Sequence, residues 1–297
     1  MENELKIVKQ LTGIDDSRIK VCEIGWTSRV YIIDEGKIVF KFPRNAKFRE
    51  ECKQEIAVLK LLKEHRFVLK VLILNWTTKD NMYFGFYGVE GKLLGEVIDN
   101  LSVQQKNEIG TQIGYFIKQL HSIKDYGDVK AQTLDEQAQE YQNWYQNDKD
   151  LLKDFFCKSE LETIDEFFKN EVPESMIGSS DLVFCHGDLD YNNTLINNKS
   201  QVGVIDFGDA RLYDRSQDFR GMDDEVLREA MIKAYGEGEI INKKAAETTS
   251  KMIDVLNMLY CIQQKNLAGI YDSLNRIKSK ILKTDILDFS IRNLTYQ

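Results

Sequence analysis

Apolar and polar residues alternate over much of the first ninety positions, which is typical of strands that bury one face. Five stretches carry this pattern or a short apolar run bounded by turn residues: 21–25, 29–33, 38–42, 68–74 and 82–89. Between the third and the fourth, apolar residues recur at helical spacing over 48–62. The pattern predicts a five-stranded antiparallel sheet with one helix.

The period of the apolar positions becomes helical beyond Gly95. One stripe consists of Ile109, Ile113, Phe116, Ile117 and Leu120. Residues 242–297 also carry apolar residues at helical spacing. The chain is expected to cross between its two parts near 86–91, where two glycines, Gly88 and Gly91, lie close together. We therefore predict an α+β fold with an N-terminal lobe and a mostly helical C-terminal lobe. These lobes are expected at 1–90 and 91–297.

A lysine and a glutamate occupy positions where apolar residues are expected. Lys41 lies on the third strand among β-branched and aromatic neighbours. Glu55 falls on the same helical face as Cys52 and Leu59. A buried carboxylate is unfavourable unless it is paired, so an ion pair between Lys41 and Glu55 would satisfy both groups. The alternative is a solvated Glu55 at the edge of the apolar stripe.

The stretch FCHGDLDYNNTLINNKSQVGVIDFGD (184–209) concentrates the candidate chemistry. It holds Asp188 and Asn193 in a His-x-Asp-x4-Asn pattern, and then an apolar strand that leads to Asp206. Phosphoryl transfer requires a carboxylate that orients the acceptor hydroxyl and oxygen ligands for magnesium. Asp188 is the candidate for the first task, and Asn193 with Asp206 for the second. The alternative interpretation is an acidic surface loop.

The composition argues against several other classes of protein. The 297 residues carry a formal charge of −8, which disfavours binding to the phosphate backbone of a nucleic acid. No apolar run approaches the ~20 residues of a membrane span, and the first residues do not form a signal peptide. The five cysteines lack disulfide or metal-binding spacing, as in a reducing compartment. We expect a cytoplasmic protein and a monomer.

Two sequence motifs resemble those of a known enzyme group. HGDLDYNN (186–193) followed by VIDFGDA (204–210) resembles the catalytic segment of the aminoglycoside phosphotransferase and choline kinase group of small-molecule kinases. IVFKFPR (38–44), with a glutamate fourteen residues after its lysine, is similar to the aminoglycoside 2''-phosphotransferases. The resemblance covers about residues 25–225 and implies a two-lobed protein-kinase-like fold. One departure is Arg215, which stands where the group tends to have proline.

The resemblance implies a binding site for ATP or GTP together with Mg²⁺. The nucleotide-binding residues would be Lys41, Glu55, Ser28, Phe86, Tyr87 and Val89. Lys41 would reach the α- and β-phosphates while Glu55 orients it. Ser28 lies in the turn GWTSRVY (25–31), whose single glycine leaves an ordinary hairpin turn as the alternative. The backbone of Tyr87 and Val89 would bind the nucleobase. Phe86 would lie at the back of its pocket or simply pack in the core.

Other residues would support the catalytic segment or contact the acceptor. By resemblance, His186 holds the catalytic loop and Asp218 anchors it, while His121 is expected to be a hydrogen-bonded structural residue. The candidate substrate-binding residues are Asp223, Asp224 and Glu225. The dipole of the helix that they open would by itself favour acids there. In the aminoglycoside 2''-phosphotransferases, however, acids at this place meet substrate ammonium groups.

The predicted function is transfer of the γ-phosphoryl group of ATP or GTP to a hydroxyl of an aminoglycoside, a small cationic substrate, which would give antibiotic resistance. The C-terminal lobe would hold the catalytic loop, the magnesium site and a helical acceptor-binding subdomain. One alternative is a kinase of the same fold for a macrolide, choline or another metabolite. The other is a non-catalytic nucleotide-binding module. Retention of Lys41, Glu55, Asp188, Asn193 and Asp206 argues against that module.

Overall fold

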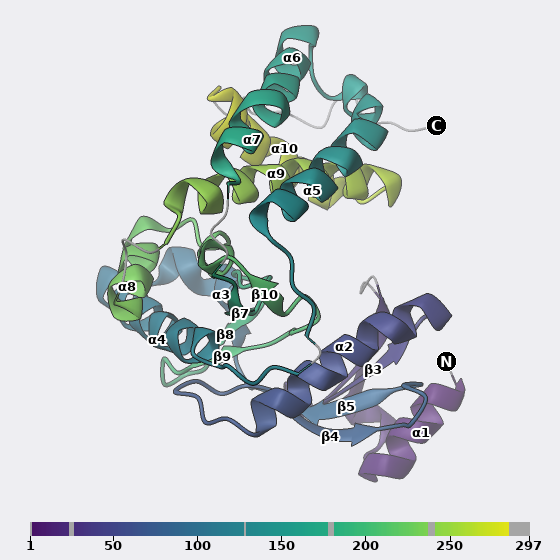
Figure 1. The fold of residues 1–297 in the computed structure, drawn as a ribbon. Helices are drawn as coiled ribbons and strands as arrows, with labels where there is room; N and C mark the ends of the chain where they lie inside the picture. Colours follow the sequence, from purple (N-terminus) through teal and green to yellow (C-terminus); the bar gives the residue numbers. More distant parts are fainter. Residues whose placement is uncertain (1, 24–26, 128, 178–180, 237–240, 285–297) are drawn as a thin grey trace. The chain divides into compact units, whose positions relative to one another are not determined.

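The computed structural model describes residues 2–23, 27–127, 129–177, 181–236 and 241–284. The chain divides into two compact units, whose elements are drawn in Figure 1. The first unit consists of Met1–Ala131 and Asp181–Ile241, and the second of Gln132–Ser180 and Asn242–Gln297. The lobe boundary expected near residue 90 stays a prediction.

The first unit begins with a sheet of five strands. They are β1 (Ile19–Cys22), β2 (Ser28–Ile33), β3 (Ile38–Pro43), β4 (Ile73–Thr77) and β5 (Phe84–Tyr87). Their order is β1-β2-β3-β5-β4, and all neighbouring pairs are antiparallel. Two 3₁₀ segments, η1 (Asp16–Arg18) and η2 (Asp34–Gly36), precede β1 and join β2 to β3. The predicted five-stranded antiparallel sheet is confirmed.

The fourth strand lies further along the chain than the apolar pattern predicted. The prediction placed it at 68–74, whereas β4 covers Ile73–Thr77. The backbone of Lys70 instead forms a parallel bridge with Gly203, and its carbonyl oxygen accepts a hydrogen bond from Val204 N at 3.1 Å. Of the run that was expected to be a strand, Leu69, Leu72 and Leu74 pack into the core of the unit, whereas Val68 and Ile73 are exposed.

A helix covers each face of the sheet, as Figure 1 shows. The predicted helix is α2 (Ala46–Lys63), and its apolar side chains pack in the main core of the unit. An additional helix, α1 (Glu2–Thr12), lies on the other face, where Val8 packs with Phe40 in a separate core. The sequence analysis did not predict α1, although Leu5, Val8 and Leu11 recur at helical spacing and Leu5 packs beside Val8.

The remainder of the first unit combines helices with short strands. Its elements are β6 (Lys92–Leu93), α3 (Leu94–Val97), η3 (Ile98–Asn100), α4 (Val103–His121), β7 (Val183–Cys185), β8 (Thr194–Ile196), β9 (Val202–Val204), β10 (Arg211–Tyr213), η6 (Arg215–Phe219) and α8 (Glu225–Tyr235). β7 pairs with β10, and β6, β8 and β9 form a three-stranded sheet. The apolar stripe predicted for α4 is completely buried.

Two glycines of α4 let α8 approach closely. A Cβ atom on Gly110 would lie 2.4 Å from the carbonyl oxygen of Leu227 on α8. On Gly114 it would lie 2.3 Å from the carbonyl oxygen of Met231. Ordinary side chains do not fit at these distances, so the two backbones meet where the glycines leave room.

The second unit is helical. Its elements are α5 (Leu134–Asp148), η4 (Lys149–Asp154), α6 (Lys158–Glu166), the π-helical segment η5 (Phe167–Glu171), α7 (Val172–Ser175), α9 (Lys243–Gln263), α10 (Leu267–Ile277) and the π-helical segment η7 (Lys278–Leu282). Its core contains Tyr145 stacked on Phe168, with ring centroids 4.0 Å apart. The predicted helix-rich C-terminal part is therefore confirmed. In the described parts of both units, no helix has the length and apolar character needed to cross a membrane.

Candidate active site

Lys41 joins three elements of the first unit. Its Nζ lies 2.7 Å from Glu55 Oε1 on α2 and 3.1 Å from Asp206 Oδ1, which follows β9. The side chains of Lys41 and Glu55 are 13% and 6% exposed, whereas that of Asp206 is 51% exposed. The predicted ion pair between Lys41 and Glu55 is therefore confirmed, and a solvated Glu55 is excluded. The same lysine also contacts a predicted magnesium ligand.

Lys41 and Asp206 stabilise the charged forms of each other. Burial by itself would lower the pKa of Lys41, but the carboxylates of Glu55 and Asp206 raise it above its ordinary value. In return, the ammonium group of Lys41 lowers the pKa of Asp206. Both groups are therefore ionised at neutral pH.

The hairpin of β8 and β9 brings Asn193 and Asp206 together. Asn193 directly precedes β8, and its carbonyl oxygen accepts a hydrogen bond from Ile205 N at 3.0 Å. Ile205 directly precedes Asp206. The backbone of Asp206 has a φ of 62°, in the left-handed region that few non-glycine residues occupy. The two predicted magnesium ligands are thus neighbours at the open end of one hairpin.

Both oxygens of the Asp188 carboxylate accept hydrogen bonds. Arg220 Nη2 donates to Oδ1 at 3.0 Å, and Asn193 Nδ2 donates to Oδ2 at 3.0 Å. Asn193 Nδ2 also donates to the backbone oxygen of Asp188 at 2.8 Å. The Asp188 side chain is nevertheless 40% exposed. Its carboxylate is held in one orientation and remains open to an incoming hydroxyl group.

The oxygen atoms at this place fit a magnesium ion. Because the amide nitrogen of Asn193 is directed at Asp188, the planar amide turns its oxygen away from that carboxylate. Asp206 adds a half-exposed carboxylate that Lys41 contacts through Oδ1. Carboxylate and amide oxygens are ligands that Mg²⁺ accepts in proteins. Asn193 and Asp206 are therefore chemically suited to hold the ion.

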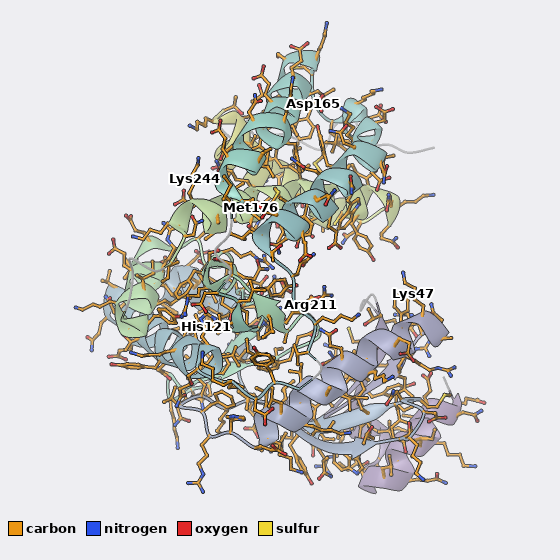
Figure 2. The ribbon with its side chains drawn as sticks, viewed as in Figure 1. Lys47, His121, Asp165, Met176, Arg211 and Lys244 are labelled. Carbon is orange, nitrogen blue, oxygen red and sulfur yellow. The ribbon has the colours of Figure 1, made fainter. Side chains whose placement is uncertain are left out.

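Asp218 anchors the catalytic segment from within the core. Its carboxylate accepts hydrogen bonds from the backbone N–H groups of His186 and Gly187, each at 2.9 Å. His121 Nε2 on α4, labelled in Figure 2, lies 3.2 Å from the same carboxylate. Burial opposes ionisation, but the hydrogen bond and charge of His121 with the other donors lower the pKa of Asp218. The structural contacts expected for Asp218 and His121 are present.

His186 uses both ring nitrogens inside the protein. Its Nδ1 accepts a hydrogen bond from Asp188 N at 3.2 Å, so Nε2 carries the proton donated to the carbonyl oxygen of Ile205 at 3.0 Å. The following Gly187 has a φ of 85°, and a Cβ atom there would lie 2.2 Å from the carbonyl oxygen of Asp209. The histidine therefore supports the loop, and only glycine fits beside it.

The residues predicted to bind the nucleobase lie on β5 and directly after it. Phe86 and Val89 are 3% and 6% exposed and belong to the core of the unit, whereas Tyr87 is 44% exposed. Gly88 N, between Tyr87 and Val89, donates a hydrogen bond to the carbonyl oxygen of Lys37 at 2.9 Å. Core packing of Phe86 is present, and the nucleobase contacts of the three residues stay a prediction.

Ser28 lies in the described part of the predicted phosphate loop, residues 27–31. It is 3% exposed, and its hydroxyl lies 3.5 Å from Cys52 Sγ on α2. Residues 25 and 26 of this loop lie outside the described residues. The hydroxyl group faces α2, so the predicted phosphate contact of this residue rests on its backbone.

One of the three acids at the start of α8, Asp224, has clear structural contacts. Asp224 accepts a hydrogen bond from Leu227 N at 3.0 Å as the N-cap of the helix, and Lys106 Nζ lies 2.6 Å from its other oxygen. Asp223 and Glu225 are exposed. At Asp224, the alternative explanation, in which an acid stabilises the start of the helix, therefore has direct support. The substrate role of the three acids stays a prediction.

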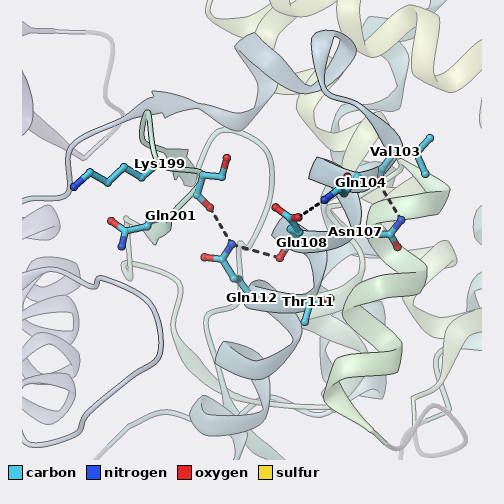
Figure 3. Close-up of a pocket in the computed structure, with 9 residues that line it drawn as sticks. Val103, Gln104, Asn107, Glu108, Thr111, Gln112, Lys199 and Gln201 are labelled. Carbon is cyan, nitrogen blue, oxygen red and sulfur yellow. Dashed lines mark hydrogen bonds between the residues drawn. The ribbon is translucent and has the colours of Figure 1, made fainter.

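A surface hollow lies on the first unit between α4 and the turn of the β8–β9 hairpin. Figure 3 shows its lining by Val103, Gln104, Asn107, Glu108, Thr111, Gln112, Lys199, Ser200 and Gln201. The hydrogen bond from Gln112 Nε2 to the carbonyl oxygen of Ser200, at 2.9 Å, holds the turn against α4. None of the predicted site residues lines this hollow.

Two residues of the site were not found by sequence reasoning. Gln217 Nε2 and Arg220 Nη2 donate to the carbonyl oxygen of Gly187 at 2.8 Å and 2.9 Å. They flank Asp218, which the motif had identified. No periodicity or spacing distinguishes them, because their contacts depend on how η6 turns back under the catalytic segment.

Comparison with known proteins gives a family and a fold. The model of a family described as "Phosphotransferase enzyme family" matches residues 18–239. No curated protein matches the chain.

Solved structures with a similar fold have low sequence identity. The GDP and kanamycin complex of APH(2")-IIia has 16% identity and a TM-score of 0.76, over 96% of this chain and 100% of that chain. The streptomycin-ATP-APH(2")-IIa ternary complex has 18% identity and a TM-score of 0.66, over 92% and 95%. Macrolide 2'-phosphotransferase MphH from Brachybacterium faecium has 16% identity and a TM-score of 0.64, over 93% and 98%. The predicted protein-kinase-like fold is confirmed.

Proposed function

The chain belongs to the phosphotransferase enzyme family, and on this premise we propose that it transfers the γ-phosphoryl group of ATP or GTP to a hydroxyl of an aminoglycoside. The observation that carries the proposal is the convergence of Lys41 on Asp206, at 3.1 Å, beside a hydrogen-bonded and half-exposed Asp188. A phosphate clamp, a metal-binding carboxylate and an acceptor-orienting carboxylate are the groups that this reaction needs.

Asp188 acts on the acceptor. Its carboxylate accepts a hydrogen bond from the acceptor hydroxyl and takes up the proton as the reaction proceeds. The acceptor oxygen forms a bond to the γ-phosphorus while the bond from that phosphorus to the β-phosphate oxygen breaks. A nucleoside diphosphate leaves. The hydrogen bonds from Arg220 and Asn193 fix the Asp188 carboxylate in advance of this step, so little reorganisation is needed.

Lys41 acts on the donor nucleotide. Its ammonium group, with a pKa raised by two carboxylates, contacts the α- and β-phosphates while Glu55 holds it in position. Asn193 and Asp206 would hold Mg²⁺, which neutralises phosphate charge when it is bound.

The acceptor class is proposed from the distribution of charge. Three consecutive acids, Asp223 to Glu225, lie at the start of α8 in the same unit as Asp188, and Asp223 and Glu225 are exposed. Such a cluster attracts a polycation such as an aminoglycoside more than a largely apolar macrolide. The fold itself does not separate the two classes, because macrolide phosphotransferases share it. We further propose that the enzyme is a cytoplasmic monomer.

A coupled assay of nucleoside diphosphate release tests the proposal. Purified protein with magnesium is supplied with ATP or GTP and with kanamycin, a macrolide or choline. Release stimulated by kanamycin is expected, and phosphorylated kanamycin is then identified by mass spectrometry. Stimulation only by another acceptor would replace the substrate class. Intact nucleotide binding without any turnover would leave the non-catalytic module in its place.

A further inference from the structure

The turn η6 contacts the catalytic triplet His186-Gly187-Asp188 through several side chains. The Asp218 carboxylate accepts hydrogen bonds from the backbone N–H groups of His186 and Gly187. Gln217 and Arg220 donate hydrogen bonds to the carbonyl oxygen of Gly187. Arg220 also reaches the Asp188 carboxylate, where Nη2 lies 3.0 Å from Oδ1. One guanidinium nitrogen therefore bridges the backbone and the side chain of the catalytic segment.

The burial of this ion pair is unequal. The side chain of Arg220 is 9% exposed, whereas that of Asp188 is 40% exposed. A buried guanidinium is unfavourable unless carboxylate and carbonyl oxygens replace its lost water, and both are present here. The cation is thus part of the interior, and the carboxylate that it holds remains accessible to an acceptor.

The two donors approach Asp188 from different elements. Arg220 follows η6 and contacts Oδ1, while Asn193 precedes β8 and contacts Oδ2. Donors on both oxygens limit the rotation of the carboxylate. Without Arg220, the Oδ1 side would lose its fixed partner, although Asn193 would still hold Oδ2. The orientation of Asp188 therefore depends on a residue outside the recognised motifs.

We propose that Arg220 is a positioning residue for phosphoryl transfer, which sets the orientation of the Asp188 carboxylate by bridging it to the carbonyl oxygen of Gly187. This inference rests on the proposed phosphotransferase function, but not on the identity of the acceptor. Because the guanidinium acts on the base and not on the donor nucleotide, its loss affects the chemical step and leaves nucleotide binding intact.

The first test compares Arg220→Ala and Arg220→Lys with Arg215→Ala. Arg215 belongs to the same turn, but its guanidinium contacts Asp181 and Tyr235, so it is a matched control. For Arg220→Ala we expect kcat to fall about 10- to 100-fold, the loss typical of a hydrogen bond to a charged group, with unchanged KM for the nucleotide. Arg220→Lys keeps the charge and should lose less. Arg215→Ala should retain kcat.

Chemical rescue separates positioning from a merely structural role. Added guanidinium chloride, at millimolar concentrations below those that unfold the protein, should restore part of the kcat of Arg220→Ala and none of the activity lost in Asp188→Asn. Sodium chloride at equal ionic strength should not restore it. Wild-type kcat in Arg220→Ala would overturn the proposal. A loss that guanidinium does not restore, with lowered stability, would also overturn it.

A second test does not need catalysis. Unfolding by urea is measured for Arg220→Ala, Asp188→Ala and the double variant, by circular dichroism. The proposal expects clearly non-additive changes, because the two side chains contact each other. Additive changes would overturn it. If no acceptor or nucleotide turnover is found for the wild type, the proposed function fails, while this cycle still decides whether Arg220 holds Asp188.

Discussion

The ammonium nitrogen of Lys41 lies 3.1 Å from the carboxylate of Asp206, although 165 positions of sequence separate the two residues. Lys41 belongs to the third strand of the N-terminal sheet, and Asp206 follows a short hairpin of the same compact unit. The predicted phosphate-binding cation and the predicted metal-binding carboxylate are thereby brought together.

Replacing Lys41 by methionine should weaken nucleotide binding and turnover together. Methionine keeps much of the side-chain volume but removes the charge that contacts phosphate oxygens. We expect about 10- to 100-fold weaker binding of the magnesium nucleotide, measured by isothermal titration calorimetry. Lys60→Met is the control, because Lys60 is an exposed residue of α2. Wild-type affinity in Lys41→Met would remove the phosphate clamp from this residue.

The variant Asp188→Asn should nearly abolish turnover. Loss of a general base typically reduces the rate by about 10²–10⁴-fold. Asparagine preserves the shape of the side chain, so binding of the nucleotide should persist. Stopped-flow or steady-state kinetics gives kcat, and calorimetry gives the dissociation constant. Intact turnover combined with lost nucleotide binding would contradict the assignment.

Asp218 should make the protein sensitive to acid. The pKa of Asp218 is lowered in the folded protein, so between its folded value and the ordinary value of about 4 the unfolded state binds more protons. Its contribution to stability is therefore complete above about pH 4 and is lost as the pH falls below that value. Urea unfolding at several pH values should show a shallower acid-side decline for Asp218→Asn. An unchanged slope would contradict this.

A larger residue at Gly114 should separate α4 from α8. Because a Cβ atom there would lie 2.3 Å from a backbone oxygen of α8, Gly114→Leu forces the helices apart, at a cost of about 1–3 kcal/mol or more in unfolding free energy. Tyr115→Leu is the control, since Tyr115 is the next residue of α4 and is 50% exposed. Equal stability of the two variants would mean that the close approach contributes nothing.

Removing the Asp224 side chain should affect stability more than acceptor binding. Its carboxylate caps α8 and pairs with Lys106, so Asp224→Ala should lower the unfolding free energy by about 1 kcal/mol. Glu229→Ala, which changes an exposed acid of the same helix, is the control. We expect an unchanged KM for the acceptor in Asp224→Ala. A large increase in that KM with unchanged stability would give this carboxylate the substrate role instead.

Local sequence patterns were sufficient for several elements. The alternation on β3 placed Lys41 on the opposite face from Phe40, and helical spacing placed Glu55 on the inner face of α2. The same reasoning misplaced β4, because an apolar run signals burial without saying which element buries it. It also missed α1, although Leu5, Val8 and Leu11 recur at helical spacing there.

The sequence by itself determined which residues are predicted to carry the chemistry, because the motifs around Asp188 and Asp206 combine short spacing with residue types that few other tasks require. Only the tertiary structure decided how the site is supported. The contact between Arg220 and Asp188 spans 32 positions, and it arises where η6 turns back beneath the catalytic segment. Such a contact depends on the path of the chain in space. Periodicity and spacing report only on neighbours along the chain, so they cannot reveal it.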